Sequence, residues 1–267
     1  MPVQIVQSKQ NSRLKELRRT LAHPGRSPHG LVGIEGPNLL AEALRAGLHI
    51  RCAFAAQGSE HLLDALALPP DVEVLLLPAE LLVSALATET PQPVAALVEP
   101  VDWIWRDILE PANSAAPLVV ILAGLQDPGN LGAILRSAEA FGATGVVALP
   151  GTVSAWNPKA VRASAGSVFR VPLMQSTAPE CLPRLRESGI TVFTTAVRNA
   201  VPAPGANLTQ PAAFLIGNEG SGVPPELAAL ADGAITIPCP GPVESLNASI
   251  AASILLYEAS RQRGGKP

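Results

Sequence analysis

Continuously apolar segments alternate with segments of helical periodicity in the second half of the chain, and this alternation constrains the fold more than any other feature. The apolar runs 118–124 and 212–217, for example, are each followed by a loop rich in polar residues and glycine. Strands that are apolar on both faces are typical of a parallel sheet with helices packed on both sides. The sequence therefore predicts an α/β domain with a parallel sheet over residues 118–267.

The same alternation predicts the individual elements of this domain. Strands are expected at 118–124, 145–149, 168–174, 190–196, 212–217 and 234–237, and helices at 131–140, 158–165, 179–187, 225–231 and 245–262. Ligands of such sheets bind at the carboxyl ends of the strands. Three loops rich in Gly, Asn and acidic residues are expected at those ends, at 127–132, 218–222 and 238–247.

Residues 1–98 predict a second, smaller α/β domain. Strands are expected at 30–35, 50–55, 72–77 and 94–98, and helices at 8–21, 37–46, 60–67 and 79–87. Residues 99–117 are irregular and contain prolines together with Trp103 and Trp105. This composition predicts an interdomain linker with a short strand or a helical turn.

The composition excludes a globally disordered chain, because 48% of the residues are hydrophobic and only 15% are charged. No apolar run approaches the about 18 residues of a transmembrane helix, so no membrane span is expected. The basic residues near the N-terminus have no apolar core behind them, which is unlike a signal peptide. The three cysteines are too far apart for a zinc site, and we interpret them as reduced, mostly buried thiols of a cytoplasmic protein.

Histidine is confined to the first quarter of the chain, where all four histidines lie. The predicted parallel-sheet domain therefore cannot build a Ser-His-Asp triad or a histidine general base from its own residues. Its chemistry must depend on Arg, Glu, Ser, Asn and backbone groups.

The stretch 236–253 reads as a strand, a loop with Pro238, Pro240, Gly241 and Pro242, and a helix that restarts at 244–245. The helix carries apolar residues at helical spacing, namely Leu246, Ile250, Ile254 and Tyr257. Such a loop can present backbone groups and polar side chains to a ligand. It can equally be an ordinary connection, and the stretch alone does not decide between the two.

Glycine fingerprints of nucleotide-binding proteins are missing from the chain. No G-x-G-x-x-G lies between the first strand and helix of the parallel-sheet domain, and no G-x-x-x-x-G-K-[ST] occurs anywhere. Gly217, Gly220 and Gly222 form a G-x-x-G-x-G after a strand, which on its own indicates no more than a flexible turn. A dinucleotide-binding enzyme is therefore a poorer account of the sequence.

The predicted first helix is strongly basic in a chain whose net charge is −3. Residues 8–20 contain a single acidic residue, Glu16, and five basic ones, Lys9, Arg13, Lys15, Arg18 and Arg19. A charge run of this kind is either a solvated helix face or a contact surface for RNA phosphates. Phe54 is the only aromatic residue among residues 1–98, so this domain does not resemble a platform for base stacking.

Three segments at the predicted loops resemble the three motifs of the SpoU/TrmH family, namely NLGAILRSAEAFG (130–142), FLIGNEGSGVP (214–224) and IPCPGPVESLNASIAAS (237–253). VRASAGSVFRVP (161–172) also resembles a segment of the family. SKQNSRLKELRR (8–19) and GIEGPNLLAEALRAG (33–47) are similar to the small RNA-binding domain of many members. Two places depart from the family pattern: Gln92-Pro93, where Gln-Gly is expected, and Pro238-Cys239-Pro240, where a methionine-like residue is expected.

This family comprises RNA ribose 2′-O-methyltransferases of the SPOUT superfamily that depend on S-adenosyl-L-methionine. The resemblance implies an RNA substrate-binding domain at 1–98, a linker at 99–117 and a methyltransferase domain at 118–267. It also implies that the C-terminal segment is threaded into a deep trefoil knot, a topology that is rare among proteins. Members form homodimers through this region and bind the cofactor in a bent conformation beside the interface.

The resemblance implies catalytic roles for Arg136, Asn130, Glu219, Ser245 and Asn247. Arg136 matches the essential arginine of the family, and it could bind a phosphate and stabilise an alkoxide or take the proton itself. We favour the first role, because a guanidinium resists deprotonation. Asn130 and Glu219 are expected to position the substrate or Arg136, within one chain or across a dimer. Asn130, Ser245 and Asn247 could also be ordinary helix caps, and Arg136 an ordinary surface residue.

The cofactor-binding residues implied by the resemblance are Gly217, Ile237 and Leu246, with Thr195 as a further wall of the adenine pocket. Core packing is the alternative for the two aliphatic residues. The implied RNA-binding residues are Lys9, Arg13, Arg18 and Arg19 of the basic helix, and Ser164, with Gly166, is expected to shape the substrate cleft. No metal is needed, and no cluster of Asp, Glu and His suggests one.

The sequence thus predicts a methyltransferase that acts on a ribose 2′-hydroxyl of structured RNA. The accessory domain favours ribosomal RNA over transfer RNA. Two alternatives from other classes remain: an RNA-binding protein that kept the fold but lost catalysis, and a Rossmann-type nucleotide enzyme. The presence of Asn130, Arg136 and Glu219 argues against the first, and the missing glycine fingerprint argues against the second.

Overall fold

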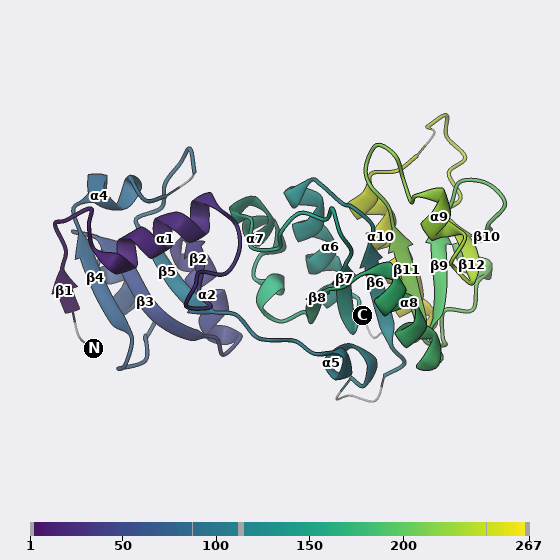
Figure 1. Ribbon diagram of the computed structural model, residues 1–267, viewed down its shortest axis with the longest axis horizontal. Helices are drawn as coiled ribbons and strands as arrows, with labels where there is room; N and C mark the ends of the chain where they lie inside the picture. Colours follow the sequence, from purple (N-terminus) through teal and green to yellow (C-terminus); the bar gives the residue numbers. More distant parts are fainter. Residues whose placement is uncertain (1–2, 87, 112–114, 244, 265–267) are drawn as a thin grey trace. The chain divides into compact units, whose positions relative to one another are not determined.

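The computed structural model in Figure 1 describes residues 3–86, 88–111, 115–243 and 245–264. Its internal contacts divide the chain into two units. The N-terminal unit contains the residues up to Asp102 together with Ser154–Phe169, and the C-terminal unit contains Trp103–Val153 together with the residues from Arg170 onward. The segment Ser154–Phe169 thus packs with the N-terminal unit, although it lies within the range 118–267 that the sequence analysis assigns to the second domain.

Among the described residues, the N-terminal unit contains a five-stranded sheet in the order β1-β4-β3-β5-β2. Strands β1, β4 and β3 are parallel to one another, whereas β5 runs antiparallel to both β3 and β2. The strands are β1 (Val3–Ile5), β2 (Val32–Glu35), β3 (His49–Ala56), β4 (Glu73–Leu77) and β5 (Val94–Glu99). The helices are α1 (Ser12–Ala22), α2 (Pro37–Arg45), α3 (His61–Asp64), α4 (Ala79–Val83) and, from the inserted segment, α7 (Pro158–Ser164).

Helix α1 begins where the sequence predicts a cap. The Asn11 side chain accepts a hydrogen bond from the Leu14 backbone N–H at 3.1 Å. Leu14, Leu17 and Leu21 are buried in the core of the sheet, so the basic residues occupy the remaining faces of the helix. The helix passes so close to β2 that a Cβ on Gly33 would lie 2.6 Å from Thr20 Oγ1.

The C-terminal unit is built on a sheet whose seven described strands are all parallel, in the order β10-β12-β9-β11-β6-β7-β8. The strands are β6 (Leu118–Leu122), β7 (Gly145–Ala148), β8 (Leu173–Gln175), β9 (Thr191–Thr195), β10 (Val201–Pro202), β11 (Ala212–Ile216) and β12 (Gly233–Thr236). The helices are α5 (Trp105–Leu109), α6 (Pro128–Ala140), α8 (Ala178–Glu187), α9 (Pro225–Ala228) and α10 (Ala248–Gln262). Strands β6 and β11 are fully buried, which confirms the prediction of a parallel sheet with apolar strands.

The central strands of this sheet set the position of its polar loops. From β6 the chain passes outward to β7 and β8, and then returns to β9 on the far side of β11. The loops that follow β6, β9, β11 and β12 therefore leave the same edge of the sheet, on the two sides of the place where the strand order reverses. The 218–222 segment and the described residues of 238–247 lie at that edge, as the sequence predicts, whereas residues 128–132 of the predicted loop 127–132 form the first residues of α6.

Several predicted boundaries are wrong. Helix α10 begins at Ala248 rather than at 245, because the Asn247 side chain caps it by accepting hydrogen bonds from the backbone N–H groups of Ser249 and Ile250. The strand expected at 168–174 is reduced to β8, because Ser167–Phe169 forms a 3₁₀ turn. The short strands β1 and β10 were not predicted, since neither shows a continuous apolar run.

Two of the three cysteines, Cys52 and Cys181, are buried, whereas Cys239 is exposed. Burial raises the pKa of the Cys52 thiol and raises that of Cys181 to about 12, so both remain protonated at neutral pH. Among the described residues, no helix is long and apolar enough to cross a membrane.

Candidate active site

A cavity of about 550 Å³ opens at the carboxyl ends of β9, β11 and β12. Its walls are the segments 195–197, 216–223, 235–239 and 243–246 with the start of α10, apart from residue 244, which lies outside the described residues. A volume of roughly 300–1,000 Å³ is typical of sites for small molecules and cofactors. The lining combines aliphatic side chains with exposed backbone and hydroxyl groups, so it can hold a ligand that has both a flat apolar part and polar edges.

All four residues that the resemblance implies for the cofactor line this cavity, namely Thr195, Gly217, Ile237 and Leu246. The Thr195 hydroxyl donates to the Leu215 carbonyl at 3.1 Å, so this side chain is bound to the neighbouring strand. Ile237 and Leu246 are only partly buried, unlike ordinary core residues. Their aliphatic side chains are therefore available to a ligand in the cavity.

Gly217 makes the closest backbone approach in the site. A Cβ at this position would lie 2.1 Å from the carbonyl carbon of Gly222 and 2.2 Å from the Val223 nitrogen. Asn218 and Gly222 are joined by a pair of backbone hydrogen bonds, of 3.0 and 2.9 Å, that closes the loop between them. The turn that the sequence analysis describes as flexible is thus a tightly closed loop.

Asn218 contributes to this closure, although the sequence analysis gave it no role. Its Oδ1 accepts from the backbone N–H of Gly220 at 2.9 Å, and its Nδ2 donates to the Gly124 carbonyl at 2.9 Å. Asn favours turns because its side chain hydrogen-bonds the backbone two residues on, and this preference could have suggested the role from the sequence.

Glu219 joins two loops through a set of hydrogen bonds. Its carboxylate accepts from the backbone N–H groups of Gln126 (3.2 Å) and Asp127 (3.1 Å) and from Asn130 Nδ2 (3.0 Å). Partial burial acts to raise the pKa of Glu219, but the hydrogen bonds from Asn130 and from the backbone hold it below its ordinary value. Glu219 is therefore ionised at neutral pH, with its oxygens engaged by groups of the protein.

Asn130 connects this cluster to the start of α10. Asn247 Nδ2 donates to Asn130 Oδ1 at 3.0 Å, and the Ser249 hydroxyl lies 3.1 Å from the same oxygen. Ser249 also lies 2.7 Å from Asn247 Oδ1. The amide of Asn130 thus bridges Glu219 on one side and the cap of α10 on the other. Ser249, which the sequence analysis did not select, completes the bridge.

Arg136 lies further along α6, where its side chain is exposed. Among the described residues it forms no hydrogen bond or ion pair, so the structure does not join it to Asn130 or Glu219 within one chain. Its guanidinium is free to bind an external anion. Ser245 lines the cavity and is exposed, just before the Asn247 cap. The structure therefore brings together Asn130, Glu219 and Asn247, and leaves Arg136 apart from them.

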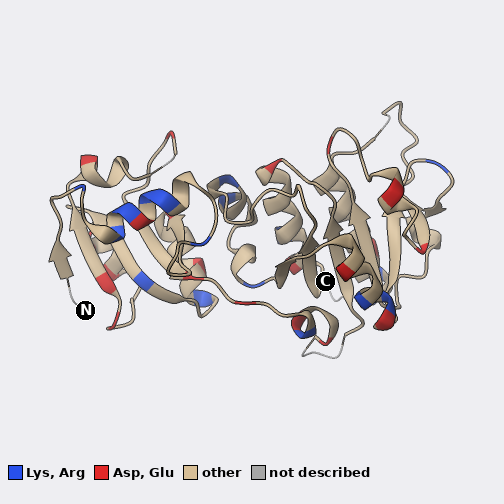
Figure 2. Cartoon of the chain, in the orientation of Figure 1, with Lys and Arg blue, Asp and Glu red and all other residues tan. Residues whose placement is uncertain are grey.

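The residues predicted to bind RNA lie in the N-terminal unit (Figure 2). Arg13 pairs with Glu73 at 3.1 Å and with Glu16 at 3.5 Å. Arg18 donates to the backbone and side chain of Ser84, both at 3.3 Å. Lys9, Lys15 and Arg19 are exposed, and their side chains form no hydrogen bond or ion pair within the described part of the chain. The basic surface thus consists of three free cations and two engaged ones.

Ser164 is fully buried in α7. Its hydroxyl donates to the Val161 carbonyl at 2.8 Å and accepts from the Val168 N–H at 3.5 Å. The side chain therefore stabilises the end of α7 and presents no polar group to a substrate. Gly166 follows in the left-handed region (φ 90°), where a Cβ would lie 2.6 Å from the Glu42 side chain.

Helix α10 packs against α6 (Figure 1) and also carries an exposed apolar stripe. Ile250, Ile254 and Tyr257 are 51%, 37% and 54% exposed. Tyr257 also makes an edge-to-face contact with Phe141, with a ring separation of 5.7 Å. The helical spacing seen in the sequence therefore marks a surface and not the core.

Comparison with protein families identifies two matching regions. Residues 117–257 match the model of the SpoU rRNA Methylase family, and residues 11–96 match the MRM3-like substrate binding domain. The 23S rRNA (guanosine(2553)-2′-O)-methyltransferase RlmP of Bacillus subtilis is 30% identical over 256 residues, which cover 94% of this chain and 97% of that protein.

Solved structures agree with this similarity. The SpoU methyltransferase AviRb from Streptomyces viridochromogenes, in complex with the cofactor AdoMet, has a TM-score of 0.83 at 28% identity and covers 97% of this chain and all of its own (100%). An AdoMet-bound rRNA methyltransferase from Sinorhizobium meliloti has a TM-score of 0.82 at 28% identity, with 97% and 98% of the two chains covered. The TrmH/SpoU tRNA modifying enzyme of A. aeolicus covers 60% of this chain and 80% of its own, with a TM-score of 0.51 at 29% identity.

Replacing Gly217 by alanine should abolish binding at the cavity. The added Cβ overlaps the backbone of Gly222 and Val223, so the 218–222 loop has to open and release Glu219. Isothermal titration calorimetry with S-adenosylmethionine checks this, and we expect no detectable binding at concentrations that saturate the wild type.

Gly220→Ala is the matched control, because a Cβ there meets only Asn218 Oδ1, at an ordinary contact distance of 3.5 Å. It should retain binding. If Gly217→Ala bound S-adenosylmethionine with wild-type affinity, the close approach of Gly217 to Gly222 would not be required for the site.

Proposed function

The chain belongs to the SpoU rRNA methylase family and is an RNA ribose 2′-O-methyltransferase that uses S-adenosylmethionine. We propose that its substrate is ribosomal RNA and that its site residues are those at the edge of the cavity. The observation that carries the site assignment is the cavity at the carboxyl ends of β9, β11 and β12, with Asn130, Glu219 and Asn247 clustered beside it. This places a pocket for a small molecule next to a set of polar groups that includes no histidine.

The residues of the cavity fit S-adenosylmethionine. Ile237 and Leu246 offer aliphatic surface to an adenine ring, and the loop closed by Gly217 offers backbone groups to its polar edges. Hydroxyl groups of Thr195 and Ser245 line the same cavity. The cofactor supplies an activated methyl group on a sulfonium. We assign Thr195, Gly217, Ile237 and Leu246 to holding it.

The protein residues must align a ribose hydroxyl with that methyl group and ease loss of the hydroxyl proton. Alignment of two bound reactants can contribute roughly 7–11 kcal/mol to lowering the barrier. We assign to Arg136 the binding of a neighbouring RNA phosphate and the stabilisation of the developing alkoxide, because its guanidinium is exposed and has no partner among the described residues.

Glu219 is a positioning residue in this scheme. Its carboxylate oxygens already accept three hydrogen bonds, and its lowered pKa makes it a poor proton acceptor. It instead holds Asn130 in place, and Asn130 in turn holds Asn247 and the start of α10. Asn130, Asn247 and Ser245 then form the polar edge between cofactor and RNA.

We further propose a homodimer that forms through the stripe of Ile250, Ile254 and Tyr257, together with a C-terminal trefoil knot. Three exposed apolar residues along one face of a helix favour a partner surface. Ala133 of α6 lies beside the stripe of α10, and Arg136 follows Ala133 by one helical turn. A dimer formed through the stripe would therefore bring Arg136 close to the partner chain. The knot rests on the family resemblance alone.

We propose that residues 1–98 bind the RNA, that residues 99–117 connect the two domains and that residues 118–267 carry catalysis. We also propose that the protein acts in the cytoplasm, where ribosomes are methylated. The match of residues 11–96 to a substrate-binding domain supports this division. Ribosomal RNA is favoured over transfer RNA because RlmP aligns over 94% of the chain, whereas the tRNA modifying enzyme covers 60%.

Replacing Arg136 by alanine should lower methyl transfer to ribosomal RNA by at least about 100-fold, the effect of removing one stabiliser of a developing oxyanion. Cofactor binding should not change, because Arg136 does not line the cavity. Incorporation of labelled methyl groups measures the rate, and nucleoside mass spectrometry identifies the 2′-O-methyl product. Arg106→Ala, at an exposed arginine of α5, is the control. Full transfer by a folded Arg136→Ala protein would exclude the catalytic role.

Replacing Lys15 and Arg19 together by glutamine should weaken RNA binding and reduce its dependence on salt. Both side chains are exposed, whereas Arg13 and Arg18 are engaged within the unit. Each lost phosphate contact should lower the slope of log K against log salt by about 0.7–0.9. Titrations of RNA at several salt concentrations give the slope.

The control for this double variant removes two exposed arginines elsewhere, with Arg51→Gln and Arg106→Gln. An unchanged slope in the Lys15 and Arg19 variant would remove this helix from the RNA interface.

Replacing Tyr257 by lysine should convert a dimer into a monomer, because the charge would be desolvated in the apolar interface. Analytical ultracentrifugation at micromolar concentration measures the change in mass. Leu230→Lys is the matched control, since Leu230 is 47% exposed in the same unit but lies outside the stripe. A monomeric wild type, or a Tyr257→Lys protein that stays dimeric, would contradict the proposed interface.

A further inference from the structure

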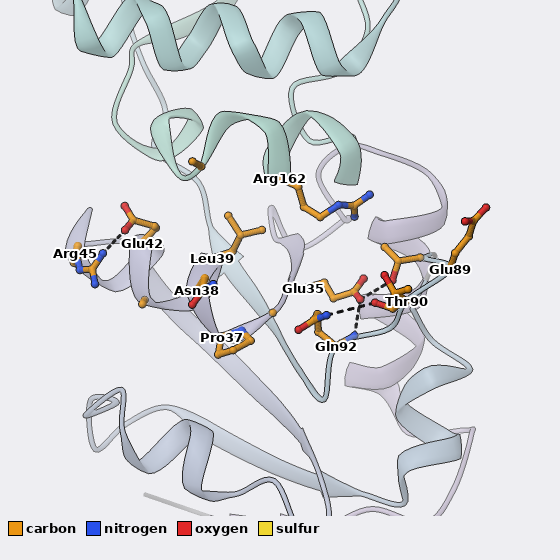
Figure 3. A pocket seen from close by; sticks show the side chains of 14 residues that line it. Glu35, Pro37, Asn38, Leu39, Glu42, Arg45, Glu89, Thr90, Gln92 and Arg162 are labelled. Carbon is orange, nitrogen blue, oxygen red and sulfur yellow. Dashed lines mark hydrogen bonds and ion pairs between the residues drawn. The ribbon is translucent and has the colours of Figure 1, made fainter.

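The N-terminal unit contains a second cavity, of about 880 Å³, that no step described so far uses (Figure 3). It lies between the start of α2, the 88–92 segment and α7. Its lining includes charged and polar side chains, namely Glu35, Asn38, Gln92 and Arg162. A cavity of this size can hold a nucleotide.

Glu35 is the buried charged residue of this cavity. It is only 6% exposed, at the end of β2. Its Oε1 accepts hydrogen bonds from Thr88 Oγ1 at 2.6 Å and from the Gln92 backbone N–H at 2.9 Å, so both acceptor positions of that oxygen are filled. Its Oε2 has no hydrogen-bond partner among the described residues.

A buried carboxylate oxygen without a donor is unfavourable, because it has lost its water and gained nothing in return. Such groups are rare in native proteins and require an explanation. Among the described residues, donors reach Oε1 but not Oε2, so a ligand with an N–H group would complete the site. A negatively charged group, by contrast, would be repelled from this oxygen.

The other charged groups indicate how the rest of such a ligand is held. Arg45 is paired with Glu42, so it is not available as a free cation. Arg162 of α7 is exposed and has no hydrogen bond or ion pair among the described residues. Figure 3 shows Arg162 and Glu35 extending toward the same part of the cavity. Glu35 lines the cavity, but its Oε2 has almost no exposed surface, so the carboxylate has to turn toward the cavity to meet a ligand, whereas Arg162 is exposed at the rim.

We propose that this cavity binds an unpaired RNA base that carries an exocyclic amino group, with the amino group donating to Glu35 Oε2 and Arg162 contacting the adjacent phosphate. Carboxylates accept from the amino group of cytosine, and RNA is read at unpaired bases through such edges. Uracil is disfavoured, because carbonyl oxygens flank its only ring N–H group and would face the carboxylate. The inference rests on the proposed RNA substrate.

The test compares the binding of fluorescent cytidine and uridine pentamers to the full-length protein by fluorescence anisotropy. The wild type should bind the cytidine pentamer more tightly, by roughly tenfold, the effect of satisfying or leaving one buried acceptor. This comparison needs no variant. Equal affinities for the two pentamers would overturn the proposal.

Glu35→Gln tests the oxygen itself. The glutamine oxygen can replace Oε1 and keep the bonds from Thr88 and Gln92, while its NH₂ group turns the open acceptor into a donor. The preference for cytidine should then be lost or reversed, with the thermal unfolding midpoint close to that of the wild type. A folded variant that keeps the preference would overturn the proposal.

Glu89→Gln is the matched control, because Glu89 is an exposed carboxylate that lines the same cavity. It removes the same charge and should keep the preference. If both variants lose it equally, the effect is one of overall charge and the specific contact is excluded.

Measurements of methyl transfer distinguish a failure of this proposal from a failure of the proposed ribosomal RNA substrate. With ribosomal RNA, Glu35→Gln should raise KM about tenfold and leave kcat near the wild-type value, because Glu35 lies outside the cofactor cavity. An equal loss in kcat would contradict a binding role. A wild type that methylates no ribosomal RNA would refute the proposed substrate, whereas the pentamer preference would still report on the cavity.

Discussion

The carboxylate of Glu219 holds together the loops on which the candidate active site is built. It accepts hydrogen bonds from the backbone of one loop and from Asn130, while its own position depends on the close approach of Gly217 to Gly222. A larger residue at 217 cannot be accommodated without opening this loop. The chain of contacts continues through Asn130 to the cap of α10, so the loops that follow β6, β11 and β12 form one hydrogen-bonded unit. The cavity wall and the polar edge are thus parts of the same network.

This arrangement explains how a domain without histidine can support methyl transfer. The reaction starts from an activated methyl donor, so the protein has to align the reactants and stabilise charge more than it has to supply a strong base. In the site we propose, the amide groups of Asn130 and Asn247 and the carboxylate of Glu219 provide alignment, because several hydrogen bonds fix the geometry of each. In the function we propose, the exposed guanidinium of Arg136, which has no partner among the described residues, provides the charge. The two tasks are divided between residues that the structure holds firmly and one that it leaves exposed.

Much of the C-terminal fold could be predicted because its signals are local. The strand at 118–122 is apolar throughout, as predicted, whereas α6 begins at Pro128 next to an Asp127 cap and not at the predicted residue 131. The start of α10 was mispredicted, because the sequence offers polar residues at 244, 245 and 247 and only the three-dimensional contacts of Asn247 select the cap. Similarly, nothing near Arg13 in the sequence indicates that Glu73 neutralises it. Ser164 matched a family segment, yet its hydroxyl is used inside α7. Long-range partners decided each of these cases.

Glu219 and Glu35 show why a residue type does not define a role by itself. Glu35 ends strand β2 and Glu219 follows strand β11, and each carboxylate lines a cavity. The protein supplies donors to both oxygens of Glu219, so that carboxylate is complete without a ligand and serves to position its neighbours. Among the described residues, donors reach only one oxygen of Glu35, which lies in a more deeply buried site. The number of donors that the fold provides therefore separates a carboxylate that supports a site from one that can recognise a ligand, and sequence motifs contain no record of that number.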